Sequence, residues 1–331
     1  EMVNRDSDLY REHPDWILQT PERHACHGRF QYVLDFSRKE VVDRIYDMMA
    51  KILSEAKVSY IKWDMNRSIT ECYSAALPAD RQGEVYHRYI LGVYDLYERL
   101  TSQFPHVLFE SCASGGGRFD PGMLYYAPQG WTSDDSDAVE RIKIQYGTSY
   151  CYPISSMGSH VSVTPNHQVN RNTPFYTRAN AAYFGTFGYE LDLNALTEEE
   201  QAEVKEQIAF MKENRGLFQF GVFYRLQSPF THNSSAWMVV SQDKKRAIVG
   251  WYRTLNGINL PYTRIRLQGL DPDMEYQIQG DPAAHYGDEL MNLGLITTDT
   301  SSGQAEGEEK MCQDFESRLY ILSAAGGGGQ R

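Results

Sequence analysis

The feature that most limits the fold of this chain is the alternation of short apolar runs with amphipathic stretches up to about residue 215. The run 58–63 favours a β-strand, and the runs 107–110, 130–133 and 157–163 predict further strands. A helix with one apolar stripe is predicted between the first two runs: Val85, Tyr89, Val93, Leu96 and Leu100. Strand–helix alternation is typical of a parallel sheet covered by helices, so we expect an α/β fold here.

Two of the predicted helices begin with a capping box, in which a Ser or Thr and a Glu three positions later satisfy each other's backbone N–H groups. These are Ser37–Glu40 and Thr197–Glu200. The first helix would place Val41, Ile45, Met48 or Met49, and Ile52 on one face. Gly216 is expected to end the second helix.

The pattern changes at about Pro229, after which five short β-favouring runs are separated by turn residues and no helix is predicted. The runs are 236–241, 246–252, 263–267, 276–278 and 318–323. We predict three parts: an α/β part at 1–228, a small antiparallel β-sandwich at 229–325, and a Gly-rich tail at 326–331. We expect the tail to be a linker or a frayed end.

Charge and cysteine content exclude several classes of function. The net charge of −12 argues against nucleic-acid binding, which requires a positive surface. No apolar run approaches the length of about 20 residues that a membrane span requires. The five cysteines show no CxxC spacing and no Cys/His cluster, so we expect neither a zinc site nor a disulfide framework. We also expect no bound cofactor. The odd number of cysteines suits a reducing compartment, and we expect the protein to be cytoplasmic.

The densest polar cluster lies at the end of the strand predicted at 58–63. Lys62, Asp64 and Asn66 alternate along an extended segment and therefore share one side. The C-terminal ends of parallel strands carry the active sites of (β/α)8 TIM barrels, so this cluster is a candidate site. The alternative is a solvated strand end with a Lys–Asp pair.

A second acidic cluster, Asp134, Asp135 and Asp137, follows the strand predicted at 130–133. Crowded carboxylates repel one another, which can keep one of them protonated near neutral pH. The alternatives are a helix N-cap, which is our interpretation of Asp137, or a cation site. A metal site formed by His160, His167 and Asp64 is disfavoured, because their spacing follows no metal-ligand pattern.

The spacing of Asp64 and Asp134 corresponds to two β/α units of an eight-fold barrel, at about 31 residues for each unit. One strand would lie between them, and three glycines, Gly115 to Gly117, follow that strand. We interpret these glycines as backbone that closely approaches something, such as a ligand hydroxyl. Two opposed carboxylates are typical of glycoside hydrolysis. Retention or inversion depends on their distance, which a sequence does not give.

Three motifs in order resemble those of the α-galactosidases of glycoside hydrolase family 36. They are Lys62-Trp63-Asp64-Met65-Asn66-Arg67, Cys112-Ala113-Ser114-Gly115-Gly116-Gly117-Arg118 and Ser133-Asp134-Asp135-Ser136-Asp137. The segments 1–10 and 32–37 are also similar to that family. The resemblance implies a (β/α)8 barrel, of which this chain holds strands four to eight, followed by the antiparallel β-domain.

The resemblance also implies roles for individual residues. Asp64 matches the nucleophile and Asp134 the general acid/base of a retaining mechanism that needs no metal. The positions that match residues contacting galactose are Arg29, Lys62, Asn66, Cys112 and Gly115. The implied activity is hydrolysis of terminal α-linked galactose from melibiose- and raffinose-type oligosaccharides.

The chain differs from the family by the absence of an N-terminal β-domain and of the first barrel strands. Five strands cannot close an eight-stranded barrel, so we expect that the N-terminal portion of the same enzyme is needed as a partner. We also expect a homo-oligomer. The alternatives are a raffinose-synthase-like α-galactosyl transferase using the same site, and a non-catalytic carbohydrate-binding or assembly fragment.

Overall fold

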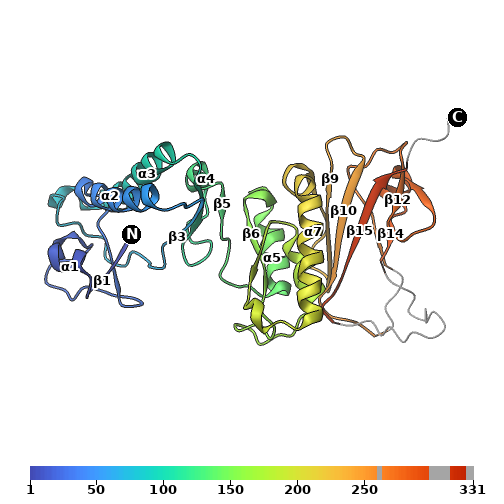
Figure 1. Ribbon diagram of the computed structural model, residues 1–331, viewed down its shortest axis with the longest axis horizontal. Helices are drawn as coiled ribbons and strands as arrows, with labels where there is room; N and C mark the ends of the chain where they lie inside the picture. The colour runs from blue at the N-terminus through green and yellow to red at the C-terminus, as the bar shows by residue number, and fades with distance from the viewer. Residues whose placement is uncertain (259–262, 298–313, 326–331) are drawn as a thin grey trace. The chain divides into compact units, whose positions relative to one another are not determined.

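The computed structural model describes residues 1–258, 263–297 and 314–325. These residues fall into two compact units, which we call unit 1 (Glu1–Asp134) and unit 2 (Asp135–Arg331). The Gly-rich tail predicted at 326–331 and the fifth cysteine, Cys312, lie outside the described residues. Figure 1 traces both units and labels their helices and strands.

Unit 1 combines a three-stranded parallel sheet of order β3-β4-β5 with a small antiparallel pair, β1 and β2. Its strands are β1 (Met2–Asn4), β2 (Gln31–Val33), β3 (Tyr60–Asp64), β4 (Leu108–Cys112) and β5 (Gln129–Gly130). Its helices are α1 (Asp8–Glu12), α2 (Lys39–Glu55), α3 (Val85–Gln103) and α4 (Pro121–Tyr126), with 3₁₀ turns at Pro14–Trp16 and Ala79–Glu84. The strands predicted at 58–63, 107–110 and 130–133 correspond to β3, β4 and β5.

The core of unit 1 lies between the parallel sheet and helices α2 and α3, which run side by side in Figure 1. The stripe predicted for α3 is confirmed, since all five of its residues are buried. The stripe predicted for α2 is confirmed only in part. Val41, Ile45 and Met49 pack in the core, whereas Met48 and Ile52 are about half exposed.

The capping box predicted at Ser37–Glu40 is wrong. Helix α2 begins at Lys39, and its N-cap residue Arg38 makes no side-chain cap. The Ser37 hydroxyl instead donates to Oδ1 of the buried Asp35, whose other oxygen accepts from the Ser74 hydroxyl. A buried carboxylate requires donors, and this requirement takes the Ser37 hydroxyl away from the helix end.

Unit 2 contains a parallel pair, β6 and β7, a six-stranded antiparallel sheet of order β13-β12-β15-β10-β9-β8, and the pair β11-β14. Its strands are β6 (Gly158–Ser162), β7 (Thr186–Glu190), β8 (Val222–Gln227), β9 (Ser234–Val240), β10 (Arg246–Arg253), β11 (Arg264–Ile265), β12 (Glu275–Ile278), β13 (Ala284–Tyr286), β14 (Leu295–Ile296) and β15 (Glu316–Ala324). Its helices are α5 (Ala138–Thr148), α6 (Phe175–Ala182), α7 (Glu198–Phe220) and α8 (Gly287–Asn292), with 3₁₀ turns at Ile154–Ser156 and Leu193–Ala195. Figure 1 shows α5 and α7 between β6 and the large antiparallel sheet.

Helix α7 confirms one prediction and corrects another. The capping box at Thr197 and Glu200 is present, because each side chain accepts the other's backbone N–H. The helix does not end at Gly216 but continues to Phe220, with Gly221 as its C-cap. Leu217 and Phe218 are buried, and this burial outweighs the roughly 1 kcal/mol that a glycine costs inside a helix.

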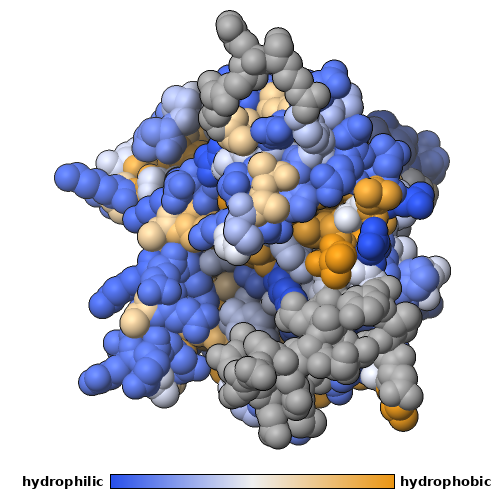
Figure 2. All heavy atoms as spheres, turned by 90° about the vertical axis from the view of Figure 1, so that its right-hand side faces the viewer, coloured by the Kyte–Doolittle hydropathy of each residue, from blue (hydrophilic) through white to orange (hydrophobic). Residues whose placement is uncertain are grey.

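The six-stranded antiparallel sheet of unit 2 contains four of the five strands predicted after Pro229. The fifth, predicted at 263–267, forms β11 in the separate pair. Strand β8 of the six-stranded sheet lies before Pro229 and already pairs with β9, and the domain division at 228/229 stays a prediction. The prediction that no helix interrupts these strands is wrong, since α8 buries Leu290 in the same core. Figure 2 shows the face of this sheet domain covered mostly by hydrophilic side chains, with a smaller apolar group.

Candidate active site

Three parallel strands of unit 1 end beside one another, and each leads into one of the polar motifs. Strand β3 ends at Asp64, β4 ends at Cys112, and β5 is followed by residues 131–134. Strand β4 lies between the two strands that carry the carboxylates, as the spacing predicted. The register pairs Asp64 with Cys112 and Lys62 with Glu110, so these four side chains share one face of the sheet.

The carboxylate of Asp64 has one oxygen held by a neighbour and one with unused acceptor capacity. Oδ2 accepts a hydrogen bond from Nδ2 of Asn66, two residues further along the chain. Oδ1 is buried and has no hydrogen-bond partner among the described residues. Asn66 in turn accepts from the Ser114 hydroxyl through its Oδ1, at 3.4 Å. The end of β3 is therefore tied to the loop that follows β4.

Cys112 lies beside Asp64 as a buried, neutral thiol. Burial raises the pKa of the Cys112 thiol to about 12, and the neighbouring Asp64 carboxylate adds to this effect. A thiol with such a pKa carries almost no thiolate at neutral pH, and the thiolate is the nucleophilic form. Cys112 is therefore a wall of the site rather than a nucleophile.

Lys62 pairs with Glu110 and not with Asp64, so the alternative interpretation of this cluster as a Lys–Asp pair is wrong. Its Nζ lies 3.6 Å from Oε1 of Glu110 and 4.6 Å from the centre of the Trp131 ring. The Lys62 side chain keeps 39% of its surface exposed, whereas the Glu110 side chain keeps 3%. The ammonium is thus held between a buried carboxylate and an aromatic face, while part of it remains open to the site.

The glycines after β4 allow the chain to approach the backbone in front of Asp134. A Cβ atom on Gly115 would lie 2.7 Å from the Asp134 nitrogen and 2.8 Å from Cα of Ser133. Gly115 also has a φ of +81°, which side chains disfavour. A Cβ on Gly116 would lie 2.4 Å from the Thr132 carbonyl oxygen. The close approach predicted from the glycines is present, and the partner shown is the chain's own backbone.

The acidic cluster after β5 divides into residues with different surroundings. Asp134 is exposed. Asp137 is buried and is the N-cap of α5, where it accepts from the N–H groups of Val139 and Glu140. Burial raises the pKa of Asp137, although its ion pair with Arg171 opposes this. The prediction that Asp137 is a helix cap is confirmed.

Arg29 lies in a tight turn closed by the backbone pairing of Gly28 with Gln31. It is exposed and has a left-handed φ of 54°. The turn packs against the end of the first motif, since a Cβ on Gly28 would lie 2.4 Å from Nη1 of Arg67. The structure thus brings the loop that carries Arg29 to Arg67, three positions after Asp64.

The glycine-rich loop is anchored at its far end by a buried ion pair. Arg118 donates to both oxygens of Glu1, at 2.7 and 2.8 Å. Tyr89 and Trp63 also donate to the Glu1 carboxylate, at 2.7 and 2.6 Å. Burial opposes ionisation of Glu1, but Arg118 and these donors outweigh it and lower the pKa of Glu1 to about 2.

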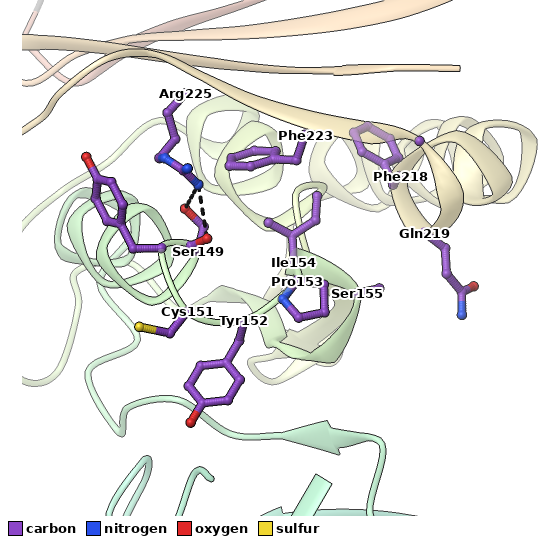
Figure 3. A pocket seen from close by; sticks show the side chains of 12 residues that line it. Ser149, Cys151, Tyr152, Pro153, Ile154, Ser155, Phe218, Gln219, Phe223 and Arg225 are labelled. Atoms are coloured by element: carbon purple, nitrogen blue, oxygen red, sulfur yellow. Dashed lines mark hydrogen bonds between the residues drawn. The ribbon is translucent and has the colours of Figure 1, made fainter. Parts of the chain in front are cut away.

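Asp64 and Asp134 do not belong to the lining of either of two pockets among the described residues. One, of about 220 Å³, lies beside the loops after β3 and β4 and includes Met65 and Ser114 in its lining. The other, of about 320 Å³, lies in unit 2, where Figure 3 shows Arg225 donating to the backbone and hydroxyl oxygens of Ser149.

No group of three or more His, Cys, Asp and Glu side chains in the described ranges is arranged to hold a metal ion. Four cysteines in these ranges are free thiols: Cys26, Cys72, Cys112 and Cys151. No helix among the described residues combines the length and the apolar composition that a membrane span requires.

Comparison with protein families agrees with the motifs and extends along most of the chain. Residues 1–221 match the melibiase family, and residues 234–322 match the C-terminal domain of glycosyl hydrolase family 36. The chain belongs to glycoside hydrolase family 36. The resemblance predicted from the three motifs is thereby confirmed.

Curated members of family 36 are similar to this chain over most of its length. The α-galactosidase AgaA of Geobacillus stearothermophilus is 54% identical over 98% of this chain, and α-galactosidase 1 of Pediococcus pentosaceus is 50% identical over 98%. In both comparisons the chain spans 43% of the relative's length.

Solved structures of family 36 enzymes share the fold. The α-galactosidase of Lactobacillus brevis superposes with a TM-score of 0.95 at 51% identity, over 100% of this chain and 44% of that one. Structures of AgaA, with a TM-score of 0.92 and 51% identity, include complexes with raffinose and stachyose and cover 98% of this chain and 44% of AgaA. The predicted fold class, part of a TIM barrel followed by an antiparallel β-domain, is confirmed.

Sequence reasoning assigned no role to three residues that the structure places around Lys62: Tyr60, Glu110 and Trp131. The sequence could have indicated that Glu110 faces the site, because it lies two positions before Cys112 on the same strand and therefore on the same face. Its partners could not be found this way, because they depend on the register between strands.

Proposed function

We propose that this protein is a retaining α-galactosidase, with Asp64 as the nucleophile and Asp134 as the general acid/base. The observation that carries the proposal is that the two carboxylates follow β3 and β5, the parallel strands on either side of β4. Two carboxylic acids that flank a glycosidic bond are what glycoside hydrolysis requires. The substrates are melibiose- and raffinose-type oligosaccharides with a terminal α-linked galactose.

The relatives support both the reaction and the pair of residues. Those quoted above are α-galactosidases, and AgaA binds raffinose and stachyose in its solved structures. Besides a shared substitution, each of those two complexes carries one substituted aspartate. The two aspartates are separated along AgaA by the same number of residues as Asp64 and Asp134 here. The spacing is therefore compatible with this pair acting together.

The reaction takes place in two displacements. In the first, a carboxylate oxygen of Asp64 bonds to the anomeric carbon as the bond to the leaving oxygen breaks, and Asp134 gives that oxygen its proton. In the second, the Asp134 carboxylate takes a proton from water, which attacks the anomeric carbon and releases Asp64. Asn66 orients the nucleophile through Oδ2, which leaves Oδ1 without a competing donor among the described residues.

The sugar is bound by side chains and backbone around this pair. Lys62 and Asn66 supply donors from the end of β3, and Cys112 and Gly115 form the wall at the end of β4. Arg29 belongs to the turn that packs on Arg67, and we propose that it contributes a further donor to the sugar. None of these groups requires a metal or a cofactor.

The protein works together with a preceding portion of the same enzyme. The described residues contain two parallel sheets, β3-β4-β5 in unit 1 and β6-β7 in unit 2, whereas a TIM barrel has eight strands. The quoted relatives are more than twice as long as the matched region. Assembly into a homo-oligomer and a cytoplasmic location stay predictions.

The test is turnover of an aryl α-galactoside by the chain alone and by the chain joined to the portion that precedes it in its relatives. We expect Asp64→Ala to reduce turnover at least about 1,000-fold, and Asp273→Ala, an exposed residue of unit 2, to leave it unchanged. Proton NMR should show α-galactose as the first product. A first product with the β configuration would refute retention, and unchanged turnover in Asp64→Ala would refute the nucleophile.

The same assay separates the alternatives. A transferase would pass galactose to an added sugar acceptor more rapidly than to water, although its first displacement is identical. A non-catalytic fragment would bind galactosides without turnover even when joined to the preceding portion. The names of the relatives favour hydrolysis over both.

A further inference from the structure

The side chains around Lys62 form a polar network that is centred on the buried Glu110 and comes from three adjacent strands. Tyr60 and Lys62 come from β3, Glu110 from β4 and Gln129 from β5. The register pairs Lys62 with Glu110 and Glu110 with Gln129, so these residues lie on the same face as Asp64. The proposed reaction assigns no role to Tyr60, Glu110 or Gln129.

The donors around Glu110 are divided unequally between its two oxygens. Oε2 accepts from the Tyr60 hydroxyl and, at 3.1 Å, from Nε2 of Gln129. Gln129 also donates to the Tyr60 oxygen at 3.1 Å, which closes a triangle of three side chains. Oε1 is buried, has no hydrogen-bond partner among the described residues, and faces Nζ of Lys62 at 3.6 Å.

This arrangement fixes the carboxylate and directs one oxygen at the lysine. A carboxylate with so little exposed surface is costly unless it is ionically paired or hydrogen-bonded, and Tyr60 and Gln129 supply the hydrogen bonds. Lysine has a flexible four-carbon stem whose ordering costs rotamer entropy. A fixed carboxylate on one side and the Trp131 ring on the other restrict that freedom before a sugar binds.

We propose that Glu110 is a positioning residue, which holds the Lys62 ammonium over Trp131 so that it can donate to a galactose hydroxyl beside Asp64. The inference rests on the proposed function, since it deepens the role of Lys62 in the same site. Glu110 touches no substrate itself and acts only through Lys62.

The test is a double-mutant cycle between Glu110 and Lys62, made in the form of the protein that turns over an aryl α-galactoside. Glu110→Gln keeps the shape and one acceptor oxygen for Tyr60 and Gln129, but it removes the charge that attracts the ammonium. We expect it to lower kcat/KM about 10- to 100-fold, because a displaced binding group misplaces the sugar. In a Lys62→Met background, the same substitution should cost less than about 3-fold, since residues that act as a unit are not additive.

Two further variants separate positioning from stability. Glu316→Gln makes the same change in the buried pair with Arg253 in unit 2 and should leave kcat/KM unchanged. Tyr60→Phe removes one donor to Glu110 from a residue that is 43% exposed, and it serves if Glu110→Gln does not fold. It should lower kcat/KM by a smaller factor, again only when Lys62 is present.

A fluorescence measurement tests the positioning without turnover. The contribution of Trp131 to the emission is the part that is lost in Trp131→Phe. We expect this contribution to change in Glu110→Gln in the same direction as in Lys62→Met, because both variants take the ammonium away from the ring. Losses in kcat/KM that multiply in the double mutant, or Trp131 emission unaffected by Glu110→Gln, would overturn the proposal. Absence of turnover in every form, together with the expected fluorescence change, would refute the proposed function and leave the positioning supported.

Discussion

Replacing Arg118 by Met should destabilise the protein strongly near neutral pH and much less at about pH 3. The substitution leaves the stem of the side chain but removes the cation that pairs with Glu1, whose side chain has no exposed surface. Removing one partner of a buried ion pair typically costs about 3–5 kcal/mol, because the other charge is left uncompensated. We expect a loss of that size in the free energy of unfolding at about pH 7.

The pH dependence gives the sharper test. In the wild-type protein the pKa of Glu1 is lowered from 4.5 to about 2, so this group contributes stability above pH 4.5 that is lost as the pH falls towards 2. That shift corresponds to about 3 kcal/mol. Without Arg118, the burial that opposes ionisation of Glu1 is less fully offset, so the pKa of Glu1 rises and the variant loses less stability than the wild type as the pH falls. The difference between variant and wild type should therefore shrink on acidification.

The measurement is urea unfolding at about pH 7 and about pH 3, followed by tryptophan fluorescence and circular dichroism together, because two compact units need not unfold in one step. Arg81→Met, in the exposed pair with Glu84, is the matched control and should change the stability far less. A difference below about 1 kcal/mol at neutral pH, or one that grows as the pH falls, would refute the reasoning.

Two other substitutions test the geometry around the site and the fold of unit 2. Gly115→Ala should reduce kcat about 100-fold, because its Cβ would displace the backbone of Ser133 and Asp134. Gly216→Ala is the control and should leave kcat unchanged, because its Cβ would meet nothing within 4 Å. An equal kcat in the two variants would contradict this reasoning. Thr197→Ala should lower the free energy of unfolding by about 1 kcal/mol in urea titrations, since it removes the cap of α7. The same loss in Thr197→Ser, which keeps a capping oxygen, would show that capping is not the cause.

Local patterns predicted the elements whose cause lies within a few residues. The stripe of α3 and the capping box at Thr197 follow from helix periodicity and backbone donors, and both are present. Ser37 shows the limit of such patterns. Its hydroxyl donates to Asp35 instead of the helix end, and the second donor to Asp35 is Ser74, 39 positions further along the chain. Gly216 shows another, since the burial of Leu217 and Phe218 decides where α7 ends.

The candidate site follows the same division. The motifs identify Asp64, Lys62 and Asn66 because alternation along one strand puts them on one face. The pairing of Lys62 with Glu110 instead of Asp64 depends on the parallel register of β3 and β4, which no local pattern contains. Strand β7 (Thr186–Glu190) was also not predicted, since its central glycine weakens the β-favouring pattern.

The loop that follows β4 connects the two carboxylates without contributing a charged group to the reaction. On one side the Ser114 hydroxyl donates to Asn66, which holds Asp64, and on the other side Gly115 packs on the backbone of Asp134. The ion pair of Arg118 with Glu1 anchors the end of this loop. Retaining glycosidases need their two carboxyl groups about 5–5.5 Å apart. In the mechanism proposed above, that separation depends on the loop, so substitutions that move the loop should change kcat even when Asp64 and Asp134 are intact.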